Sequence, residues 1–394
     1  MAKGYDVIVA GGGSFGMSAA YYLAKQGANV LVLDAHDPPH DKGSHHGHTR
    51  IFRMAYTMGP DYVSLAIRSR QLWEQLEQEA GGLGELVADQ GKRPSQPGAD
   101  RTIFRQTGVV SVGPGGSRFL RSKEESCRTF GIPYERLTPF QLRLRWPGWT
   151  VPEGMEGLYE PEAGILFSEA VIRAYRLLAL KHGAELLVNT PVHGLQYGPD
   201  SVTVHTSGSS YTASRVLLSP GVRLPQLVPE LNLPIRTLRK AIGWFEAPAE
   251  RYEAGVFPAF IVNEGHDVEY YGIPAVDGRG LKVGRHDQGQ VLLPDQTALP
   301  FGVYQEDEAH LKAFLSTYMP QAKGIVSAGV CKYEMTPDEG FFIGRHPHQP
   351  KVWIAGGGSG HGFKFASAIG EALSQAMLFG RSEKSLAAFS IPKR

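Results

Sequence analysis

The N-terminal stretch constrains the fold most strongly, because it places a glycine-rich turn between two apolar strands. Residues 5–10 form an apolar run of strand type, and residues 11–16 read Gly-Gly-Gly-Ser-Phe-Gly. A helical pattern then continues to Gly27, and a second apolar run ends in Asp34. Strand, glycine turn, helix, strand and acid in this order predict a Rossmann-like unit that binds a dinucleotide.

Each glycine of this turn has a separate expected task. Gly11 makes the tight turn, Gly13 lets the backbone approach a pyrophosphate, and Gly16 lets the helix pack closely on the strand. The free N–H groups at the start of the helix would face the phosphates, and Asp34 would accept hydrogen bonds from a ribose hydroxyl. The structural alternative is a glycine-rich turn in some other strand–helix–strand unit.

The composition argues against several classes of protein. Forty Lys and Arg residues against 39 Asp and Glu residues leave a formal charge of +1, which predicts no nucleic-acid or membrane partner. No apolar run approaches the roughly 20 residues that span a bilayer. The chain enters its first strand without a signal-peptide pattern, so we expect a cytoplasmic protein. Two cysteines, Cys127 and Cys331, are too few for a disulfide framework.

The end of the chain shows the same order of patterns as its start: a strand, a glycine-rich turn and a helix. An apolar run at residues 352–355 leads into Gly-Gly-Gly-Ser-Gly-His-Gly, and a helical pattern continues from there to Gly380. Lys364 falls in the first turn of this helix, where a cation opposes the helix dipole, so we interpret it as held for an anionic partner. Two glycine-rich junctions fit one extended dinucleotide and favour FAD over a nicotinamide cofactor.

Basic and histidine-rich segments are candidates for the rest of the site. Residues 43–49 read Gly-Ser-His-His-Gly-His-Thr, but no carboxylate or cysteine lies nearby at ligand spacing, so we predict no metal site. Arg50 and Arg53 form either a solvated basic turn or a bidentate carboxylate site. Because strand side chains alternate, Lys282 and His286 share one sheet face, which suits a pocket wall.

The order of predicted elements indicates an α/β (α+β) fold with two interleaved domains. The first is a discontinuous Rossmann-like FAD-binding domain of residues 1–80, 150–225 and 325–394. The second is an antiparallel-sheet substrate-binding domain of residues 81–149 and 226–324. Residues 80–100 are polar, lack periodicity and contain several glycines and prolines, so we expect a surface excursion there.

Several further segments carry a more specific signal. They read Ser-His-His-Gly at 44–47, Leu-Lys-Val-Gly-Arg-His at 281–286, Val-Cys-Lys-Tyr at 330–333 and Ser-Gly-His-Gly-Phe-Lys-Phe at 359–365. Together with the N-terminal turn, these segments resemble the family of monomeric sarcosine oxidases and N-methyltryptophan oxidases, within the D-amino-acid-oxidase superfamily. The resemblance spans nearly the whole chain, apart from residues 80–100.

This resemblance implies an FAD-dependent oxidase that takes a hydride equivalent from the N-methyl carbon of a secondary amino acid. Dioxygen would accept the electrons, and the products would be formaldehyde, a primary amino acid and hydrogen peroxide. Cys331 matches the cysteine that bonds covalently to the flavin, although a free cysteine is ordinarily a small buried hydrophobe. Arg53 and Lys364 match the pair that holds the substrate carboxylate.

The resemblance also gives roles to the remaining candidates. Lys282 matches the lysine at which dioxygen is reduced, and a fixed cation there would stabilise the developing negative charge. Arg50 matches a residue beside the flavin. Tyr271, Tyr333 and His286 match residues of the substrate pocket, and His286 is a possible general base or charge partner of the amine. The expected catalytic residues are therefore Lys282, Arg50, His286 and Tyr271.

Contacts with FAD are expected from both glycine junctions, from the loop after the first unit and from a few isolated positions. These residues are Gly11, Gly13, Ser14, Phe15, Gly16, Asp34, Ala35, Gly43, Ser44, His45, Arg50, Val192, Gly221, Cys331, Gly360, Gly362, Phe363 and Lys364.

The substrate and the electron acceptor stay open at this point. The chain departs from the family pattern at His48 and Met54, where the family commonly has an acid and a histidine. The alternative functions are an oxidase or dehydrogenase of another secondary amine, such as pipecolate or a fructosyl amino acid, and a nucleotide-binding protein without catalysis. We expect a monomer whose partners are a small secondary amino acid and dioxygen.

Overall fold

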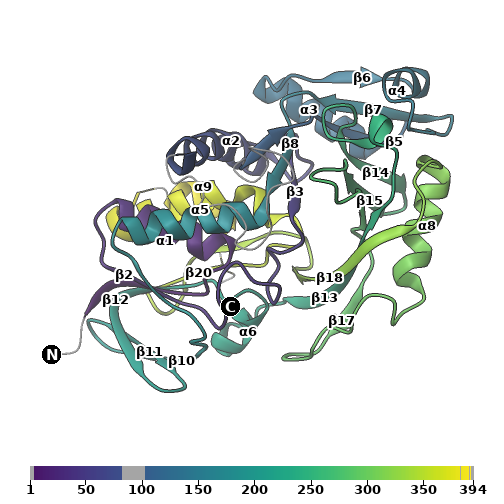
Figure 1. The fold of residues 1–394 in the computed structure, drawn as a ribbon. Coiled ribbons are helices and arrows are strands. Elements are labelled where there is room, and N and C mark those ends of the chain that lie inside the picture. The colour runs from purple at the N-terminus through teal and green to yellow at the C-terminus, as the bar shows by residue number, and fades with distance from the viewer. Residues whose placement is uncertain (1–3, 82–102, 382, 390, 392–394) are drawn as a thin grey trace.

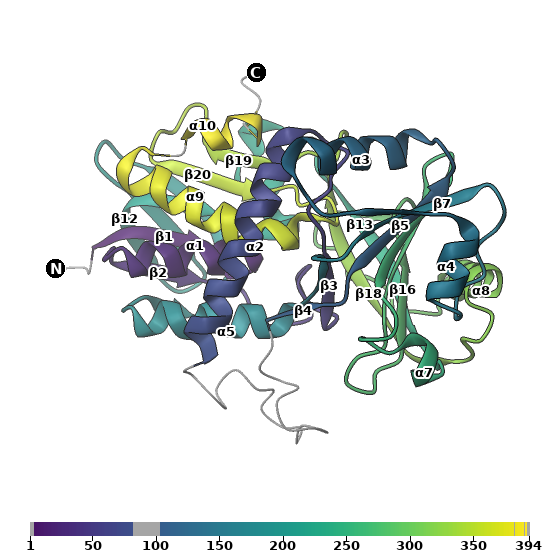
Figure 2. The ribbon, with the colours of Figure 1, turned by 90° about the horizontal axis from the view of Figure 1, so that it is seen from above.

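The computed structural model describes residues 4–81, 103–381, 383–389 and 391 (Figure 1). Nearly all of the surface excursion expected at residues 80–100 lies outside these ranges. The described chain forms two sheet-based units side by side, with a small third sheet between them (Figures 1 and 2).

The first unit is built on a mainly parallel sheet. Its neighbouring strands are β9 (Glu185–Leu187), β2 (Val30–Leu33), β1 (Tyr5–Ala10), β12 (Ser210–Leu218) and β20 (Val352–Gly356). Three antiparallel strands extend it: β19 (Phe342–Arg345), β10 (Val192–Tyr197) and β11 (Val202–Thr206). Since β1 and β20 come from opposite ends of the chain and both pair with β12, both glycine-rich junctions leave the same sheet. This arrangement confirms the predicted α/β class.

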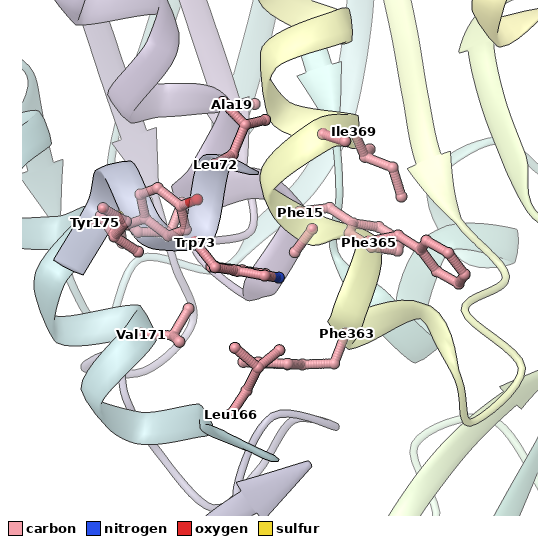
Figure 3. Packing of buried hydrophobic residues seen from close by; sticks show 14 of the residues in the cluster. Phe15, Ala19, Leu72, Trp73, Leu166, Val171, Tyr175, Phe363, Phe365 and Ile369 are labelled. Carbon is pink, nitrogen blue, oxygen red and sulfur yellow. The ribbon is translucent and has the colours of Figure 1, made fainter. Parts of the chain in front are cut away.

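Four helices cover one face of this sheet (Figure 2). They are α1 (Ser14–Lys25), α2 (Pro60–Gly81), α5 (Ser168–Lys181) and α9 (Ala366–Phe379). Their apolar side chains interlock with those of the turn before α9, where Trp73 stacks on Phe363 with ring centroids 6.4 Å apart (Figure 3). α9 packs tightly on α1, because a Cβ at Gly370 would lie 2.2 Å from Ser18 Oγ.

The second unit is a nearly antiparallel sheet, as predicted. Its strands follow the order β17 (Gln290–Leu292), β13 (Arg236–Phe245), β16 (Leu281–Arg285), β15 (Val268–Ile273), β14 (Ala259–Gly265), β5 (Val109–Pro114), β7 (Met155–Glu160) and β6 (Glu135–Leu137). β18 (Ile325–Met335) pairs with β13 along most of its length. α4 (Pro139–Arg145) and α8 (Glu306–Tyr318) lie at the outer side of this unit, whereas α3 (Arg118–Phe130) lies on the side nearer α2 (Figure 1).

The third sheet joins the two units. It consists of β3 (Thr49–Phe52), β8 (Gly164–Phe167) and β4 (Phe104–Gln106), with β8 in the centre. Gly164 is needed where β8 meets β4, because a Cβ there would lie 2.1 Å from the carbonyl oxygen of Arg105. The remaining short elements are α6 (Leu224–Leu227), α7 (Ala249–Tyr252), α10 (Glu383–Leu386), and the 3-10 turns η3 (Gly221–Arg223), η4 (Pro229–Leu231), η5 (Gly362–Phe365) and η6 (Ala387–Phe389).

The boundaries drawn for the two domains stay a prediction. By strand pairing, β7 and β18 belong to the second sheet, although the prediction assigns both segments to the FAD-binding domain. In the part of the chain that the structure describes, every helix is too short or too polar to cross a bilayer.

Candidate active site

A cavity of about 520 Å3 opens at the N-terminus of α1. Gly13 caps this helix, and no side chain bonds to the N–H groups of its first turn. A Cβ at Gly13 would meet only His45 Nδ1, at 3.9 Å, so the backbone stays open toward the cavity. Free N–H groups and the positive end of the helix dipole fit the pyrophosphate of a dinucleotide.

Gly11 and Gly16 allow close packing of the backbone around the turn. Gly11 has φ of 104°, and a Cβ there would lie 2.2 Å from the carbonyl oxygen of Ser219. A Cβ at Gly16 would lie 1.9 Å from the carbonyl oxygen of Gly11. These two positions hold α1, β1 and the end of β12 together, whereas Gly13 leaves room for a ligand.

Asp34 lies at the end of β2 and lines the same cavity. Its carboxylate accepts hydrogen bonds from Gly12 N at 2.6 Å and from His36 N at 2.8 Å. Burial tends to raise the pKa of Asp34, but an interaction with His40, 3.3 Å away, and the two backbone donors outweigh burial and lower the pKa. The carboxylate is therefore a fixed anion, with lone pairs left for ribose hydroxyls.

Most of the residues expected to contact FAD line this cavity. They are Gly11, Gly13, Ser14, Phe15, Asp34, Ala35, Gly43, Ser44, His45, Arg50, Val192, Gly221, Gly360, Gly362 and Phe363. Gly16 does not line it. Other lining residues were not predicted, because nothing in their local sequence marks them; among them are Arg223, Glu334 and residues 293–297.

A second cavity of about 150 Å3 adjoins the first. Both cavities are lined by Arg50, Tyr333, Gly360 and Phe363, so a ligand can extend from one into the other. Segments from both ends and from the middle of the chain meet here. All remaining candidates line the second cavity: Arg53, Tyr271, Lys282, His286, Cys331 and Lys364.

Arg50 is fixed by the histidine-rich loop that precedes it. Its guanidinium donates to the backbone carbonyls of Ser44, His46 and Thr49 at 2.6–2.8 Å. The loop in turn is anchored by Glu169, whose Oε1 accepts the N–H groups of residues 47 and 48. Glu169 lies in the first turn of α5, and nothing in the local sequence indicates that it anchors a loop more than a hundred residues away.

Lys282 is a buried cation at the inner end of the second cavity. It lies in β16, is 2% exposed, and donates from Nζ to the carbonyls of Gly47 at 2.8 Å and Thr49 at 3.0 Å. Burial lowers the pKa of Lys282 to about 7, and the nearby positive charge of Arg50 contributes in the same direction. No carboxylate among the described residues forms an ion pair with it.

Cys331 lies in β18 and faces the same end of the cavity. Burial tends to raise the pKa of its thiol, but a hydrogen bond with His46 and the charges of Arg50 and Lys282 outweigh burial and lower it. A lowered pKa favours the thiolate, which is the reactive form. Cys127 differs: it is buried in α3, and burial raises its pKa to about 12. Of the two cysteines, Cys331 has the environment of a nucleophile.

Arg53 directly follows β3 and lines the second cavity. Its guanidinium lies over the ring of Tyr56, 4.1 Å from the centroid, and donates to the carbonyl of Ala55. Its buried Nε has no hydrogen-bond partner among the described residues. The turn is held by Glu160, which is fully buried and accepts the N–H groups of Met54 and Ala55. Arg53 therefore has donor capacity for an anionic ligand.

Lys364 provides a second cation beside Arg53. It lies in η5 and not in α9 itself, so the predicted helix is right only from Ala366 onward. Its Nζ donates to Tyr56 Oη at 2.8 Å and to the carbonyl of His361 at 2.9 Å. Burial, reinforced by the charge of Arg53, lowers the pKa of Lys364 well below its ordinary value. An anion bound between the two cations would restore that pKa upward.

Two tyrosines, Tyr271 and Tyr333, line the same cavity. Their hydroxyls are 3.5 Å apart, and burial raises the pKa of Tyr271 to about 12 and that of Tyr333 well above its ordinary value, so both are neutral. Glycines make room for them. A Cβ at Gly284 would lie 2.5 Å from Tyr271 Oη, and one at Gly360 would lie 2.1 Å from the ring of Tyr333.

His286 stands at the outer end of the cavity. Its Nε2 lies 3.6 Å from Glu339 Oε1, and its ring lies 5.8 Å from that of Tyr333. The histidines of the loop at residues 43–49 separate: His45 packs on His40, whereas His48 contacts Asp277 at 3.2 Å. In the described ranges, no group of three or more His, Cys, Asp and Glu side chains is arranged to hold a metal ion.

The geometry supports one kind of chemistry. A long cavity with an open helix N-terminus and a fixed carboxylate fits FAD, and Arg50, Tyr333, Gly360 and Phe363 mark where its redox end would meet a small ligand. Arg53 and Lys364 can bind a carboxylate, because Arg53 Nε has no partner among the described residues and two neighbouring buried cations favour an anion. Lys282 and Cys331 line the second cavity near Arg50.

Comparisons with known proteins agree with this geometry. A family model described as FAD dependent oxidoreductase matches residues 6–376. Monomeric sarcosine oxidase from Bacillus sp. (strain B-0618) is 44% identical over 396 residues, covering 99% of this chain and 96% of that protein. N-methyl-L-tryptophan oxidase from Yersinia pestis (strain Pestoides F) is 36% identical over 392 residues, covering 99% of both. The solved structure of NikD, described as an unusual amino acid oxidase essential for nikkomycin biosynthesis, is similar with a TM-score of 0.83 at 21% identity, covering 99% of this chain and 98% of that one.

Proposed function

Because the chain belongs to the family of FAD-dependent oxidoreductases, we propose that it is an oxidase of secondary, N-methylated amino acids such as sarcosine or N-methyltryptophan. The products would be formaldehyde, the primary amino acid and hydrogen peroxide. Two relatives that match over nearly the full length carry these two substrates in their names. The observation that carries the proposal is the junction of the long cavity with a small one that contains Arg53 and Lys364.

In this proposal the chain's own side chains bind and orient the amino acid. Arg53 and Lys364 hold its carboxylate, while Tyr271 and Tyr333 form the opposite wall. His286 Nε2 takes a proton from the substrate ammonium, and Glu339, 3.6 Å away, stabilises the charge that results. Bound FAD would supply a two-electron acceptor next to the N-methyl carbon, and the buried walls exclude bulk water.

We assign Lys282 to the reaction with dioxygen. A buried cation in the second cavity, near Arg50 at the junction of the two cavities, stabilises the negative charge that develops as dioxygen is reduced. Its two hydrogen bonds to backbone carbonyls hold it in place without neutralising its charge. Arg50, fixed by three carbonyls, contributes a second positive charge at the same junction.

We propose that Cys331 bonds covalently to FAD. Joining a thiol and a flavin methyl group as a thioether releases two electrons and two protons, and dioxygen accepts them as hydrogen peroxide. The lowered pKa of Cys331 and its position in the second cavity support this assignment. After acid precipitation, flavin should stay with the wild-type polypeptide and with Cys127→Ser, but should be released from Cys331→Ser. Release from the wild-type protein refutes covalent attachment.

A substrate panel tests the activity itself. Hydrogen peroxide and formaldehyde are measured with sarcosine, N-methyltryptophan, pipecolate and a fructosyl amino acid. We expect both products from at least one N-methyl amino acid, and a strongly raised KM in Arg53→Met. Flavin bleaching by an amine without peroxide would identify a dehydrogenase instead, and no response to any amine would refute the proposal.

We also propose that the enzyme works as a monomer in the cytoplasm. The printed name of the Bacillus relative, monomeric sarcosine oxidase, supports the first part. Light scattering behind size-exclusion chromatography tests it: a mass near 43.0 kDa is expected, and twice that mass would refute it.

A further inference from the structure

Glu269 is a carboxylate in the wall of the small cavity. It lies on β15 two residues before Tyr271, so strand alternation directs both side chains to the same face, and both line the cavity. The register between β15 and β16 shows where along the cavity Glu269 lies. Ile273 on β15 pairs with Lys282 at the inner end, whereas the carbonyl of Glu269 accepts the N–H of His286 at the outer end. Glu269 therefore stands at the far end of the cavity from Lys282.

The carboxylate of Glu269 has no hydrogen-bond or ion-pair partner among the described residues. Its backbone is satisfied, because its N–H donates to Asp287 Oδ1 at 2.9 Å. The negative charge of Glu269 acts on Lys364 and Lys123, but both lysines bond elsewhere: Lys364 to Tyr56 and His361, and Lys123 to Ser111 Oγ at 2.9 Å. Neither lysine forms an ion pair with Glu269. A half-buried carboxylate without a partner is costly, and a bound cation would offset that cost.

A second acid reinforces the negative charge at this end. Glu339 lines the same cavity, and its carboxylate interacts with His286. The cavity thus has a cationic side, formed by Arg53 and Lys364, and an anionic outer end, formed by Glu269 and Glu339. A ligand that satisfies both is an amino acid with a second, positively charged group.

We propose that Glu269 selects secondary amino acids whose side chain ends in an ammonium or guanidinium group. The proposal rests on the proposed function, because it takes the substrate carboxylate to lie between Arg53 and Lys364. A cationic side chain directed outward would meet Glu269, while an anionic one would be repelled. Charge at a pocket wall discriminates between substrates by both effects.

Matched substrates test this proposal on the flavin-loaded enzyme. Nα-methyllysine, N-methylnorleucine and N-methylglutamate differ mainly in side-chain charge. The quantity compared is kcat/KM for flavin reduction without oxygen, so the result does not depend on the electron acceptor. We expect wild-type enzyme to prefer Nα-methyllysine over N-methylnorleucine by about tenfold, equivalent to about 1.4 kcal/mol, and N-methylglutamate to be the poorest substrate.

Three variants test whether Glu269 causes this substrate preference. Glu269→Gln should reduce the ratio to about one, and Glu269→Lys should invert the order in favour of N-methylglutamate. Glu264→Gln is the control, because Glu264 is an exposed acid on neighbouring β14 outside the cavity, and its ratio should equal that of wild type. Flavin content and thermal melting verify folding, and a ratio within one enzyme cancels any general loss of activity.

Two results overturn the proposal: equal kcat/KM for the lysine and norleucine analogues in wild type, or an unchanged ratio in Glu269→Gln. The proposed function fails in a different way. In that case none of the amines, including sarcosine, reduces the flavin.

Discussion

Replacing Lys282 with methionine tests the site assigned to dioxygen. The side chain is 2% exposed and unbranched, so methionine keeps most of its volume while removing the charge. A unit charge about 4 Å from the developing anion contributes about 4 kcal/mol at an effective dielectric constant of about 20. That energy corresponds to about a thousandfold in rate. The carbonyls of Gly47 and Thr49 lose their donor in this variant, which costs some stability.

The two half-reactions are measured separately by stopped-flow absorbance of the flavin. With Lys282→Met we expect reaction with dioxygen to slow by about 100- to 1,000-fold, and reduction by the amine to change only a few-fold. Lys240→Met is the matched control: Lys240 is equally buried, bonds to the carbonyl of His286, and lines neither cavity. It should leave the dioxygen step unchanged. Equal slowing of both half-reactions in Lys282→Met would refute the assignment.

The pH dependence of the dioxygen step follows from the same side chain. Burial lowers the pKa of Lys282 to about 7, so the amine is charged below that pH and neutral above it. The rate constant with dioxygen should therefore fall as pH rises through 7 in wild type. In Lys282→Met this fall should be absent, and its persistence would assign the titration to another group.

Three substitutions test the supports of the site. Burial tends to raise the pKa of Glu169, but backbone donors and a nearby arginine outweigh burial and lower the pKa to about 2. The ionised carboxylate therefore stabilises the fold above its ordinary pKa, and this stabilisation, roughly 3 kcal/mol at most, is lost as the pH falls toward 2. Urea unfolding at a series of pH values should show a smaller loss of stability in acid for Glu169→Gln than for wild type. Gly284→Ala should displace Tyr271 and so raise the KM for the amine, while the protein keeps its flavin. Adding Tyr271→Phe should partly restore the KM. An unchanged KM in Gly284→Ala would contradict the close contact between Gly284 and Tyr271. Glu160→Ala should cost about 1–3 kcal/mol in urea unfolding and raise KM, because the turn that carries Arg53 loses its acceptor; an unchanged midpoint would exclude this role.

The first unit could be predicted because its signals are local. An apolar strand, a glycine turn and a helical period follow one another within residues 5–34, and each has its own sequence pattern. The joining sheet was not predicted. β4 has three residues, too few for a period, and its pairing with β8 depends on the missing side chain of Gly164 some 60 residues away in sequence. Such pairing is a tertiary property.

The site also contains some features that local sequence patterns predicted and others that they did not. The glycine junctions indicated a dinucleotide from residues alone, and the full-length relatives confirm the family resemblance that the later motifs carried. The supporting residues were not predicted. Glu160 and Glu169 each accept two backbone N–H groups from segments more than a hundred residues away, and an isolated glutamate in sequence gives no sign of such a partner.

The motifs also explain why the reaction is easier to predict than the substrate. The four residues shared by the two cavities, Arg50, Tyr333, Gly360 and Phe363, all lie in or beside segments that carry the family resemblance. They surround the place where any substrate of this chemistry must react, so one sequence pattern serves many substrates. Glu269 lies outside those segments, at the end of the cavity that meets whatever extends beyond the reacting amine. Substrate choice therefore depends on residues that the chemistry leaves free to vary, and it must be inferred from charge and shape at that end.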